Sequence, residues 1–186
     1  MSTTKNDIIV LALDLIRAKT YSSFSYDDIA RELNITKAAI HYHFKTKEDL
    51  GLAVCQSILD AITMHREEQV AAVAKGKHPW FIIEERVRAQ ALCGICPMVS
   101  LYSDYESLPD SIRQALTRLA EAEIEYICML VKAYRAKANP DAVLTLMLAL
   151  KGALQYRRVM GDKFFEKMVK CIKEQFYQMV PKRADA

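Results

Sequence analysis

Residues 25–47 of this chain read SYDDIARELNITKAAIHYHFKTK, a pattern that predicts two short helices joined by a tight turn. The first helix begins after Ser25, whose hydroxyl can cap it, and Asp28 stands three residues further on, as in a capping box. Asn34 occupies the turn, where a left-handed backbone is needed and Asn is the best substitute for Gly. Thr36 then caps the second helix.

The second helix, which we expect to run through Tyr42, turns Ile40 inward and presents Ala38 and Tyr42 on the opposite face. Small residues at the start of such a helix let its backbone approach the floor of the DNA major groove, and an alanine methyl can contact a thymine methyl. Lys37 can reach a guanine or a phosphate, and Tyr42 can reach a phosphate or a base edge. The pattern therefore predicts a helix-turn-helix that reads DNA.

A further helix start follows directly. Thr46 and Asp49 are placed to cap a helix whose first residue is Lys47, and a helix N-terminus with a lysine favours a phosphate. Residues 36–47 contain three lysines and no acid, whereas residues 1–50 as a whole carry seven basic and seven acidic side chains, so the basic charge is focused here. The predicted DNA-binding residues are Ser25, Thr36, Lys37, Ala38, Ala39, His41, Tyr42, His43, Lys45 and Lys47.

Two other interpretations of this segment agree less well with its residues. The two helices could be ordinary packed helices whose lysines form a solvated face, but the caps, the turn and the basic residues all favour DNA binding. His41 and His43 could be metal ligands, but two residues apart on a helix they diverge, and no Cys or carboxylate is placed to complete a site. We therefore predict no metal site and no cofactor.

The composition of the whole chain predicts an all-α protein with a small head and a larger body. The 186 residues are 52% apolar, enough for a sizeable core, and include only 5 Gly and 5 Pro. No apolar run reaches the length of a membrane span, and residues 1–20 lack the apolar centre of a signal peptide, so we expect a cytoplasmic protein. The 5 cysteines, an odd number without a regular framework, suit a reducing compartment.

About nine helices are expected, divided between a helix-turn-helix DNA-binding domain over residues 1–47 and a regulatory ligand-binding and dimerisation domain over residues 48–186. In the second domain we predict one long helix from Thr46 to about Val73, followed by a clear break at residues 75–79. The remaining helices are predicted over residues 80–92, over residues 98–106, from Asp110 onward, over residues 140–159 and over residues 163–180.

The first quarter of the chain resembles the TetR (tetracycline-repressor-like) family of transcriptional regulators. Residues 16–50, IRAKTYSSFSYDDIARELNITKAAIHYHFKTKEDL, carry the resemblance, and the rest of the chain matches only in helical layout. Two departures concern the backbone, because Thr20 and Asn34 stand where family members usually carry Gly. A third concerns the DNA-reading surface, because His41 stands where Tyr is frequent.

This resemblance implies a homodimer that binds a palindromic operator in double-stranded DNA, since two recognition helices related by a twofold axis read half-sites about one turn, ~34 Å, apart. In TetR-like proteins the last two helices form the dimer interface with the symmetry mate. Gly152 in mid-helix costs about 1 kcal/mol against Ala, which fits a close helix crossing there. The alternative is that these helices complete the core of a monomer. The implied interface residues are Leu148, Gly152, Phe165, Met168, Ile172 and Phe176.

TetR-like bodies usually hold a ligand cavity among their middle helices, so the resemblance also implies a small-molecule effector that prefers the spacing of the heads that does not fit the operator. Aromatic and Met residues with phenolic groups could line such an apolar pocket, although such residues more often form plain core. The candidate ligand-binding residues are Met64, Trp80, Phe81, Cys93, Cys96, Tyr102, Tyr126, Met129 and Tyr156.

Residues 93–97, Cys-Gly-Ile-Cys-Pro, offer a second route of control. Some TetR-like proteins use a cysteine at this place to sense electrophiles, so Cys93 and Cys96 could form a thiol sensor. The alternative is that both are small apolar residues that pack a turn. A thioredoxin-like oxidoreductase would need the motif after a strand, and residues 86–92 favour a helix instead.

Two function classes are therefore compared. The first is a dimeric DNA-binding regulator, a repressor released by an inducer or by thiol modification. The second is a helical ligand-binding or interaction module that no longer binds a specific operator. An enzyme is not expected, because no catalytic base–nucleophile pair, phosphate loop or metal cluster is recognisable.

Overall fold

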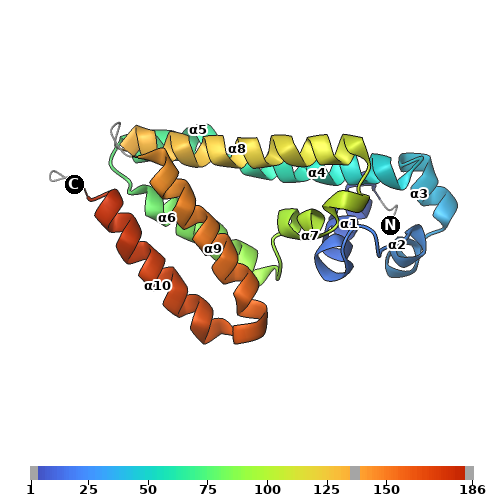
Figure 1. Cartoon of the computed structure of the whole chain (residues 1–186). Coiled ribbons are helices and arrows are strands. Elements are labelled where there is room, and N and C mark those ends of the chain that lie inside the picture. Colours follow the sequence, from blue (N-terminus) through green and yellow to red (C-terminus); the bar gives the residue numbers. More distant parts are fainter. Residues whose placement is uncertain (1–3, 135–138, 183–186) are drawn as a thin grey trace. The chain divides into compact units, whose positions relative to one another are not determined.

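The structure is a computed structural model that describes residues 4–134 and 139–182, and every regular element in these residues is a helix (Figure 1). The predicted all-α fold class is confirmed. In the described residues no helix is both long enough and apolar enough to cross a membrane. The elements are α1 (Lys5–Lys19), α2 (Tyr26–Leu33), α3 (Lys37–His43), α4 (Lys47–Thr63), α5 (Arg66–Ala74), α6 (Pro79–Leu92), α7 (Pro97–Ser103), the 3-10 helix η1 (Tyr105–Ser107), α8 (Asp110–Tyr134), α9 (Pro140–Met160) and α10 (Asp162–Met179).

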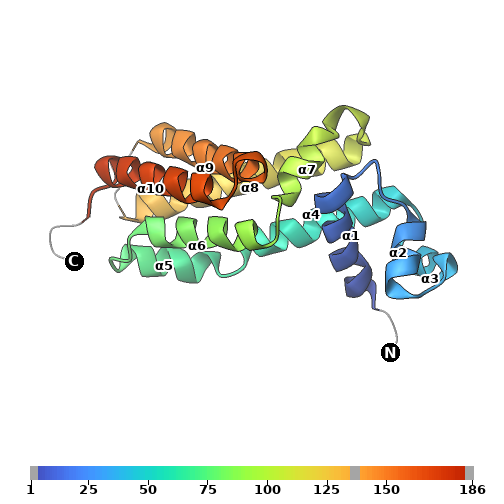
Figure 2. The ribbon, with the colours of Figure 1, turned by 90° about the horizontal axis from the view of Figure 1, so that it is seen from below.

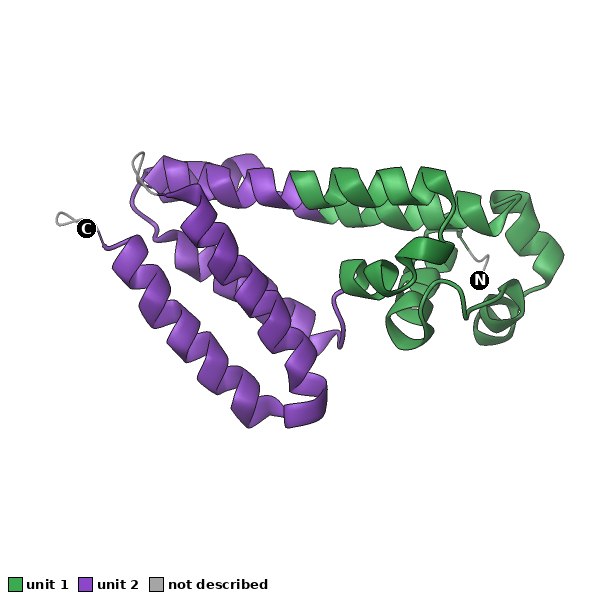
Figure 3. Ribbon diagram, viewed as in Figure 1, with its two compact units in different colours: residues 1–61, 97–121 green, residues 62–96, 122–186 purple. Residues whose placement is uncertain are grey.

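The chain forms two compact units, neither of which is continuous in sequence (Figure 3). Unit 1 comprises residues 1–61 and 97–121, and unit 2 comprises residues 62–96 and 122–186. The division into domains 1–47 and 48–186 stays a prediction, and residues 1–3, 135–138 and 183–186 of those domains lie outside the described residues.

The single helix predicted from Thr46 to Val73 is instead two helices, which is a correction. α4 ends at Thr63 and α5 begins at Arg66, with His65 between them in left-handed conformation (φ 60°). His65 Nδ1 lies 3.0 Å from the carboxylate of Glu68, three residues on, where the partner of a helix-capping residue usually stands. The apolar periodicity continues across this break, so periodicity alone could not locate it.

Unit 1 contains the head helices, α7, η1 and the start of α8 around one core. Its most deeply buried side chains include Ile8, Ile29 and Ile40, each with an exposed fraction of 0%. Gly51 on α4 is needed for this packing, because an added Cβ would lie 2.6 Å from Ile112 Cδ1 and 2.8 Å from the Tyr21 ring.

Two sequence-distant loops of unit 1 are joined by polar contacts. The Ser22 amide donates to Asp104 Oδ2 at 2.7 Å, and the hydroxyls of Ser22 and Ser107 lie 3.0 Å apart. The loop between α1 and α2 is therefore tied to the segment that contains η1.

Unit 2 is built around the antiparallel pair α9 and α10, which lie side by side in Figures 1 and 2. The predicted break between them is confirmed, since Gly161 (φ 78°) separates the two helices. Phe165, Val169, Ile172 and Phe176 recur at helical spacing on α10 and are buried.

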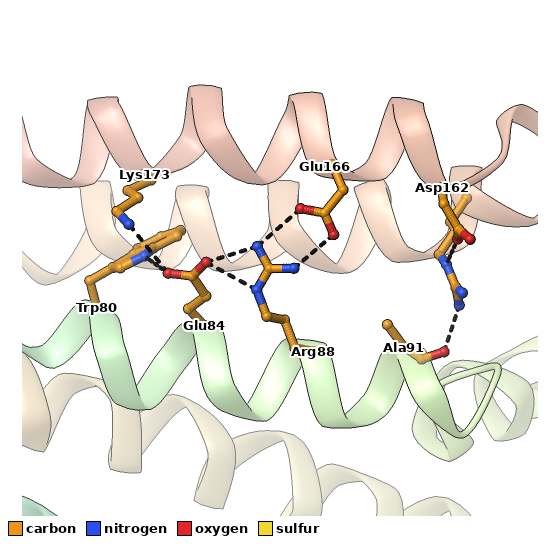
Figure 4. Close-up of polar contacts among 8 residues, drawn as sticks. Trp80, Glu84, Arg88, Ala91, Asp162, Glu166 and Lys173 are labelled. Carbon is orange, nitrogen blue, oxygen red and sulfur yellow. Dashed lines mark hydrogen bonds and ion pairs between the residues drawn. The ribbon is translucent and has the colours of Figure 1, made fainter.

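A chain of charged side chains links α6 to α10 in unit 2 (Figure 4). Arg88 donates to Glu84 on its own helix and to Glu166 on α10, at 2.9 Å and 2.7 Å respectively. Glu84 also accepts from the indole N–H of the fully buried Trp80 and lies 3.6 Å from Lys173 Nζ. Burial favours a higher pKa for Glu84, but hydrogen bonds from Arg88 and Trp80 outweigh it and lower that pKa. This carboxylate stays ionised and holds the two helices together.

The start of α6 is held by a buried histidine. His78 Nδ1 accepts from the Trp80 amide at 3.3 Å, and its Nε2 donates to the carbonyl of Val180 at 2.8 Å. The ring also stacks on Tyr177, with centroids 4.2 Å apart. These contacts require a neutral imidazole. They join the start of α6 to Val180, which directly follows α10.

Candidate nucleic-acid interface

The start of α2 has the reciprocal cap that the sequence predicts. The Asp28 amide donates to the Ser25 hydroxyl at 3.4 Å, and the Ser25 amide donates to Asp28 Oδ2 at 2.8 Å. Hydrogen bonds from Lys19, from Ser25 and from Arg31 hold the pKa of the Asp28 carboxyl well below its usual range. Ser25 thus fixes the entry into the helix-turn-helix.

The turn between α2 and α3 also has the left-handed residue that the sequence predicts. Asn34 has φ 52° and ψ 48°, the left-handed conformation, and the Ile35 amide donates to the carbonyl of Ala30 at 3.0 Å. Thr36 then accepts from the Ala39 amide at 3.2 Å, which caps α3. These two caps set the direction of α3 with local contacts only.

The outer face of α3 carries the residues that the sequence singles out. Ile40 is fully buried, whereas Ala38, Ala39, His41 and the side chain of Tyr42 are exposed. Tyr42 is 79% exposed, an unusual position for an aromatic side chain.

The two remaining predicted residues of α3 have neighbours in the protein. Lys37 Nζ lies 2.7 Å from the carboxylate of Asp27 on α2, with both side chains more than half exposed. The His43 ring packs edge-on against Tyr42, with ring centroids 5.1 Å apart. An exposed ion pair is weak, so Lys37 can exchange Asp27 for another anion.

The turn from α3 to α4 is held by a tyrosine whose polar role the sequence did not indicate. The hydroxyl of Tyr26, the first residue of α2, donates to the carbonyls of Thr46 at 2.6 Å and of Phe44 at 3.2 Å. His41 Nδ1 lies 3.2 Å from the carbonyl of Lys45. The partners are about twenty residues away from Tyr26 in sequence, so no local pattern could reveal them.

The start of α4 is capped as predicted. The Thr46 amide donates to Asp49 Oδ2 at 2.9 Å, and the Asp49 amide donates to the Thr46 hydroxyl at 3.0 Å. Lys45 is exposed just before this helix start.

Lys47, the first residue of α4, points into unit 1 in this structure. Its ammonium donates to the carbonyls of Phe24 at 2.6 Å and of Ser22 at 3.3 Å. It also lies 4.8 Å and 4.5 Å from the ring centroids of Tyr21 and Phe24. Burial lowers the pKa of Lys47, and the charges of Asp104 and Asp28 oppose that change. The phosphate contact expected for Lys47 stays a prediction, and the structure gives the side chain an internal role as well.

The candidate ligand-binding residues do not share one described cavity. Trp80, Cys96 and Tyr126 are buried in the core, whereas Phe81 and Met64 are more than half exposed. Of the remainder, Tyr102 belongs to unit 1, Cys93 is exposed and Met129 is half-buried. Tyr156 lines a surface groove on unit 2.

The residues implied for a dimer interface divide into two groups. Phe165, Ile172 and Phe176 are at most 4% exposed and belong to the core of unit 2 itself. Leu148 is 69% exposed, and Gly152 lines a groove of about 310 Å³ between α9 and α10. The other residues that line this groove are Ala149, Ala153, Tyr156, Phe164, Met168, Cys171, Ile172 and Gln175.

The described residues were also compared with the side-chain groups that bind metal ions. Among residues 4–134 and 139–182, no group of three or more His, Cys, Asp or Glu side chains is placed to hold a metal ion.

Comparison with known proteins gives matches at the head and over the whole fold. Residues 8–54 match the model of the family described as bacterial regulatory proteins, tetR family. The uncharacterized HTH-type transcriptional regulator YerO of Bacillus subtilis (strain 168) is 29% identical over 90 residues, 48% of this chain and 31% of YerO. The biofilm operon icaADBC HTH-type negative transcriptional regulator IcaR of Staphylococcus aureus (strain Newman) is 34% identical over 68 residues, 35% of this chain and 37% of IcaR.

The chain therefore spans about a third of the length of these curated relatives. A solved structure extends the likeness beyond the head. The TetR transcriptional regulator from Legionella pneumophila superposes with a TM-score of 0.79 at 28% sequence identity, covering 94% of this chain and 98% of that one. The resemblance noted in residues 16–50 thus extends, as a fold, to both compact units.

Proposed function

We propose, from the premise that this chain belongs to the TetR family of bacterial regulatory proteins, that it is a DNA-binding transcriptional regulator and acts as a repressor. The observation that carries the proposal is the outer face of α3, where capped backbone, small residues and the 79% exposed Tyr42 form a surface with no role in the core. A regulatory role, rather than an enzymatic one, is proposed with it. IcaR, which is 34% identical over 68 residues, is a negative regulator and supports the repressor assignment.

The proposed DNA contacts divide into base readers and phosphate binders. Ala38, Ala39 and Lys37 lie at the start of α3, where a recognition helix meets base edges. Tyr42 and Lys45 are exposed towards the end of that helix and in the following turn, where the first turn of α4 adds backbone amides for a phosphate. Lys37 would leave Asp27 on binding, which costs little because the pair is exposed.

The proposed homodimer uses the outer face of α9 and α10. Leu148 and Tyr156 are more than 60% exposed. Tyr156 lines the same groove as Gly152, whereas Leu148 lines a second, smaller groove between α9 and α8. A Cβ added at Gly152 would meet no described atom within 4 Å, so the close helix crossing expected at this glycine is not made inside the protomer. A helix of a second copy would fill that space.

Release from DNA is proposed to follow binding of a small molecule or modification of a thiol. Cys93 is exposed after the end of α6, whereas Cys96 is only 1% exposed, so Cys93 is the thiol that a reagent reaches first. Iodoacetamide treatment to one label at Cys93 should weaken DNA binding at least several-fold if the thiol controls release. Unchanged DNA affinity of the labelled protein, with Cys93→Ser as the unlabelled control, would leave only the small-molecule route.

The proposed function is tested with purified protein and the intergenic DNA upstream of its own gene. Fluorescence anisotropy over a salt series is compared with a scrambled duplex of the same composition. Selective binding of two protomers per duplex supports the regulator. Equal, steeply salt-dependent binding to both duplexes would contradict a specific operator in that DNA and favour the interaction-module alternative. Ala38→Glu serves as the matched negative variant, because it places an acid against the groove floor without touching the core.

A further inference from the structure

The turn between α3 and α4 is unusual in how its carbonyl groups are satisfied. Three consecutive carbonyls, those of Phe44, Lys45 and Thr46, each lie within hydrogen-bonding distance of a side-chain atom. Tyr26 provides the hydroxyl for the first and third, and His41 provides Nδ1 for the second. A carbonyl can only accept, so His41 carries its proton on Nδ1 in this arrangement.

Tyr26 itself is rigidly placed. It is the first residue of α2, directly after the Ser25 cap, and Ile29 one turn later is fully buried. Its ring meets the His41 ring edge-on, with centroids 4.9 Å apart and an interplanar angle of 61°. Burial, followed by the charge of Asp49, raises the pKa of Tyr26 to about 12, so its hydroxyl remains a donor at every physiological pH.

We infer that Tyr26 is a positioning residue for DNA binding: its hydroxyl, with His41, holds the turn between α3 and α4 in the shape that a DNA phosphate requires. The inference rests on the proposed function and adds to it a residue that does not touch DNA. Lys45 and the first turn of α4 are the groups that this turn presents. Because α2 is anchored in the core, Tyr26 fixes the turn to the same body as the recognition helix.

The order of the turn between α3 and α4 affects the expected affinity for DNA. The residues from Phe44 to Thr46 belong to no helix, so these side-chain bonds, the caps of α3 and α4 and the burial of the Phe44 ring restrict them. A turn that must be ordered on binding loses affinity, whereas a turn ordered in advance does not. A phosphate contact also releases counterions only when the cation is held at the right distance.

The test uses Tyr26→Phe in the full chain, which keeps the ring against His41 and removes only the hydroxyl. Tyr105→Phe, an exposed tyrosine on η1, is the matched control. Anisotropy with the upstream intergenic duplex over a salt series should give about a tenfold rise in Kd and a salt slope shallower by about one unit for Tyr26→Phe. The Tyr105→Phe protein should match the parent protein in both.

A second measurement follows the turn without DNA. Hydrogen exchange of the free protein should be faster at the amides of residues 45–48 in Tyr26→Phe, with the rest of unit 1 unchanged. A lower affinity with the parental salt slope and uniform exchange would reduce Tyr26 to an ordinary stabilising residue and overturn the inference. So would parental affinity and slope. If the parent protein binds no DNA selectively, the proposed function fails, and the exchange data still decide whether Tyr26 orders the turn.

Discussion

Thr20 is the residue with the least favourable backbone in the described chain. It ends α1 at φ 76° and ψ 164°, a region that is essentially limited to glycine. Among the described residues, its one side-chain hydrogen bond is to the Ser23 hydroxyl at 3.5 Å, which is too long to offset the strain. The sequence already marks this position, since TetR-like proteins usually carry Gly there.

We expect Thr20→Gly to raise the free energy of unfolding by about 1 kcal/mol, because relief of about 1–3 kcal/mol of strain exceeds the extra entropy of an unfolded glycine. Urea denaturation measures the change. Asn34→Gly is the matched control and should stay within about 0.5 kcal/mol of the parent protein, since Asn tolerates the left-handed conformation. A less stable Thr20→Gly protein would show that the threonine side chain contributes more than its backbone costs.

Lys45 and Lys47 are two residues apart and should separate DNA binding from stability. Lys47→Met leaves the carbonyls of Phe24 and Ser22 without their cation, so we expect a loss of about 1–3 kcal/mol in unfolding free energy and little change in the DNA salt slope. Lys45→Met should leave stability unchanged and make that slope shallower by about one unit. Thermal unfolding and anisotropy on both variants give the result, and a shallower slope for Lys47→Met would restore its role as a phosphate contact.

The local sequence was sufficient to predict the helix caps and the turn of the head. It was insufficient to predict the hydrogen bonds that nearby side chains make to residues distant in sequence. Ser25, Asn34 and Thr36 act on groups within five residues, so their spacing alone predicts their contacts. Tyr26 and Lys47 bond to carbonyls about twenty residues away, and the sequence carries no record of which carbonyls those are. Exposed side chains such as Tyr42 were identified because one buried neighbour, Ile40, fixes the helix face.

At the scale of the elements, helix existence followed from periodicity, while helix ends followed from capping. The boundary at Gly161 was predictable because glycine marks it, but the break at His65 was not, because left-handed helix ends are usually marked by Gly or Asn. The same limit applies to α10. Its apolar stripe predicted burial correctly, but the sequence does not distinguish burial in the protomer, found for Phe165 and Phe176, from burial in a dimer.

The start of α6 should make stability depend on pH. Burial lowers the pKa of His78, the hydrogen bond to the Val180 carbonyl opposes this, and the charge of Lys182 lowers it further. The aromatic side chains of Tyr177, Tyr134 and Phe176 surround the ring. Because the folded pKa lies below the unfolded value, the stabilisation is complete above about pH 6.5 and is lost as pH falls through the folded pKa.

We therefore expect the unfolding free energy to fall between pH 7 and pH 5, with the His78→Asn variant showing a flatter profile. Asn can still cap α6, but without the stack on Tyr177 the variant should be about 1 kcal/mol less stable at pH 7.5. Chemical denaturation at several pH values measures both quantities. Parallel profiles for the two proteins would assign the pH dependence to another group.

For the whole molecule, the proposed dimer gives the clearest prediction. Leu148→Glu places a charge on the outer face of α9 and should cost about 2–4 kcal/mol of association free energy, so that monomers appear in sedimentation velocity at micromolar concentration. Leu92→Glu is the matched control, since Leu92 is 89% exposed at the end of α6 and borders no described groove. If both variants dissociate equally, the interface is not confined to α9 and α10.

The contact between Ser22 and Asp104 has a consequence for how the protein is made. Helices α1 to α3 emerge from the ribosome first, yet the unit they belong to also needs residues 97–121, including Asp104, Ser107 and Ile112. At about 5–20 residues per second, translation from residue 61 to residue 121 takes roughly 3–12 s. For that interval the nascent head lacks its partners, so most of the chain must be synthesised before unit 1 can complete its fold.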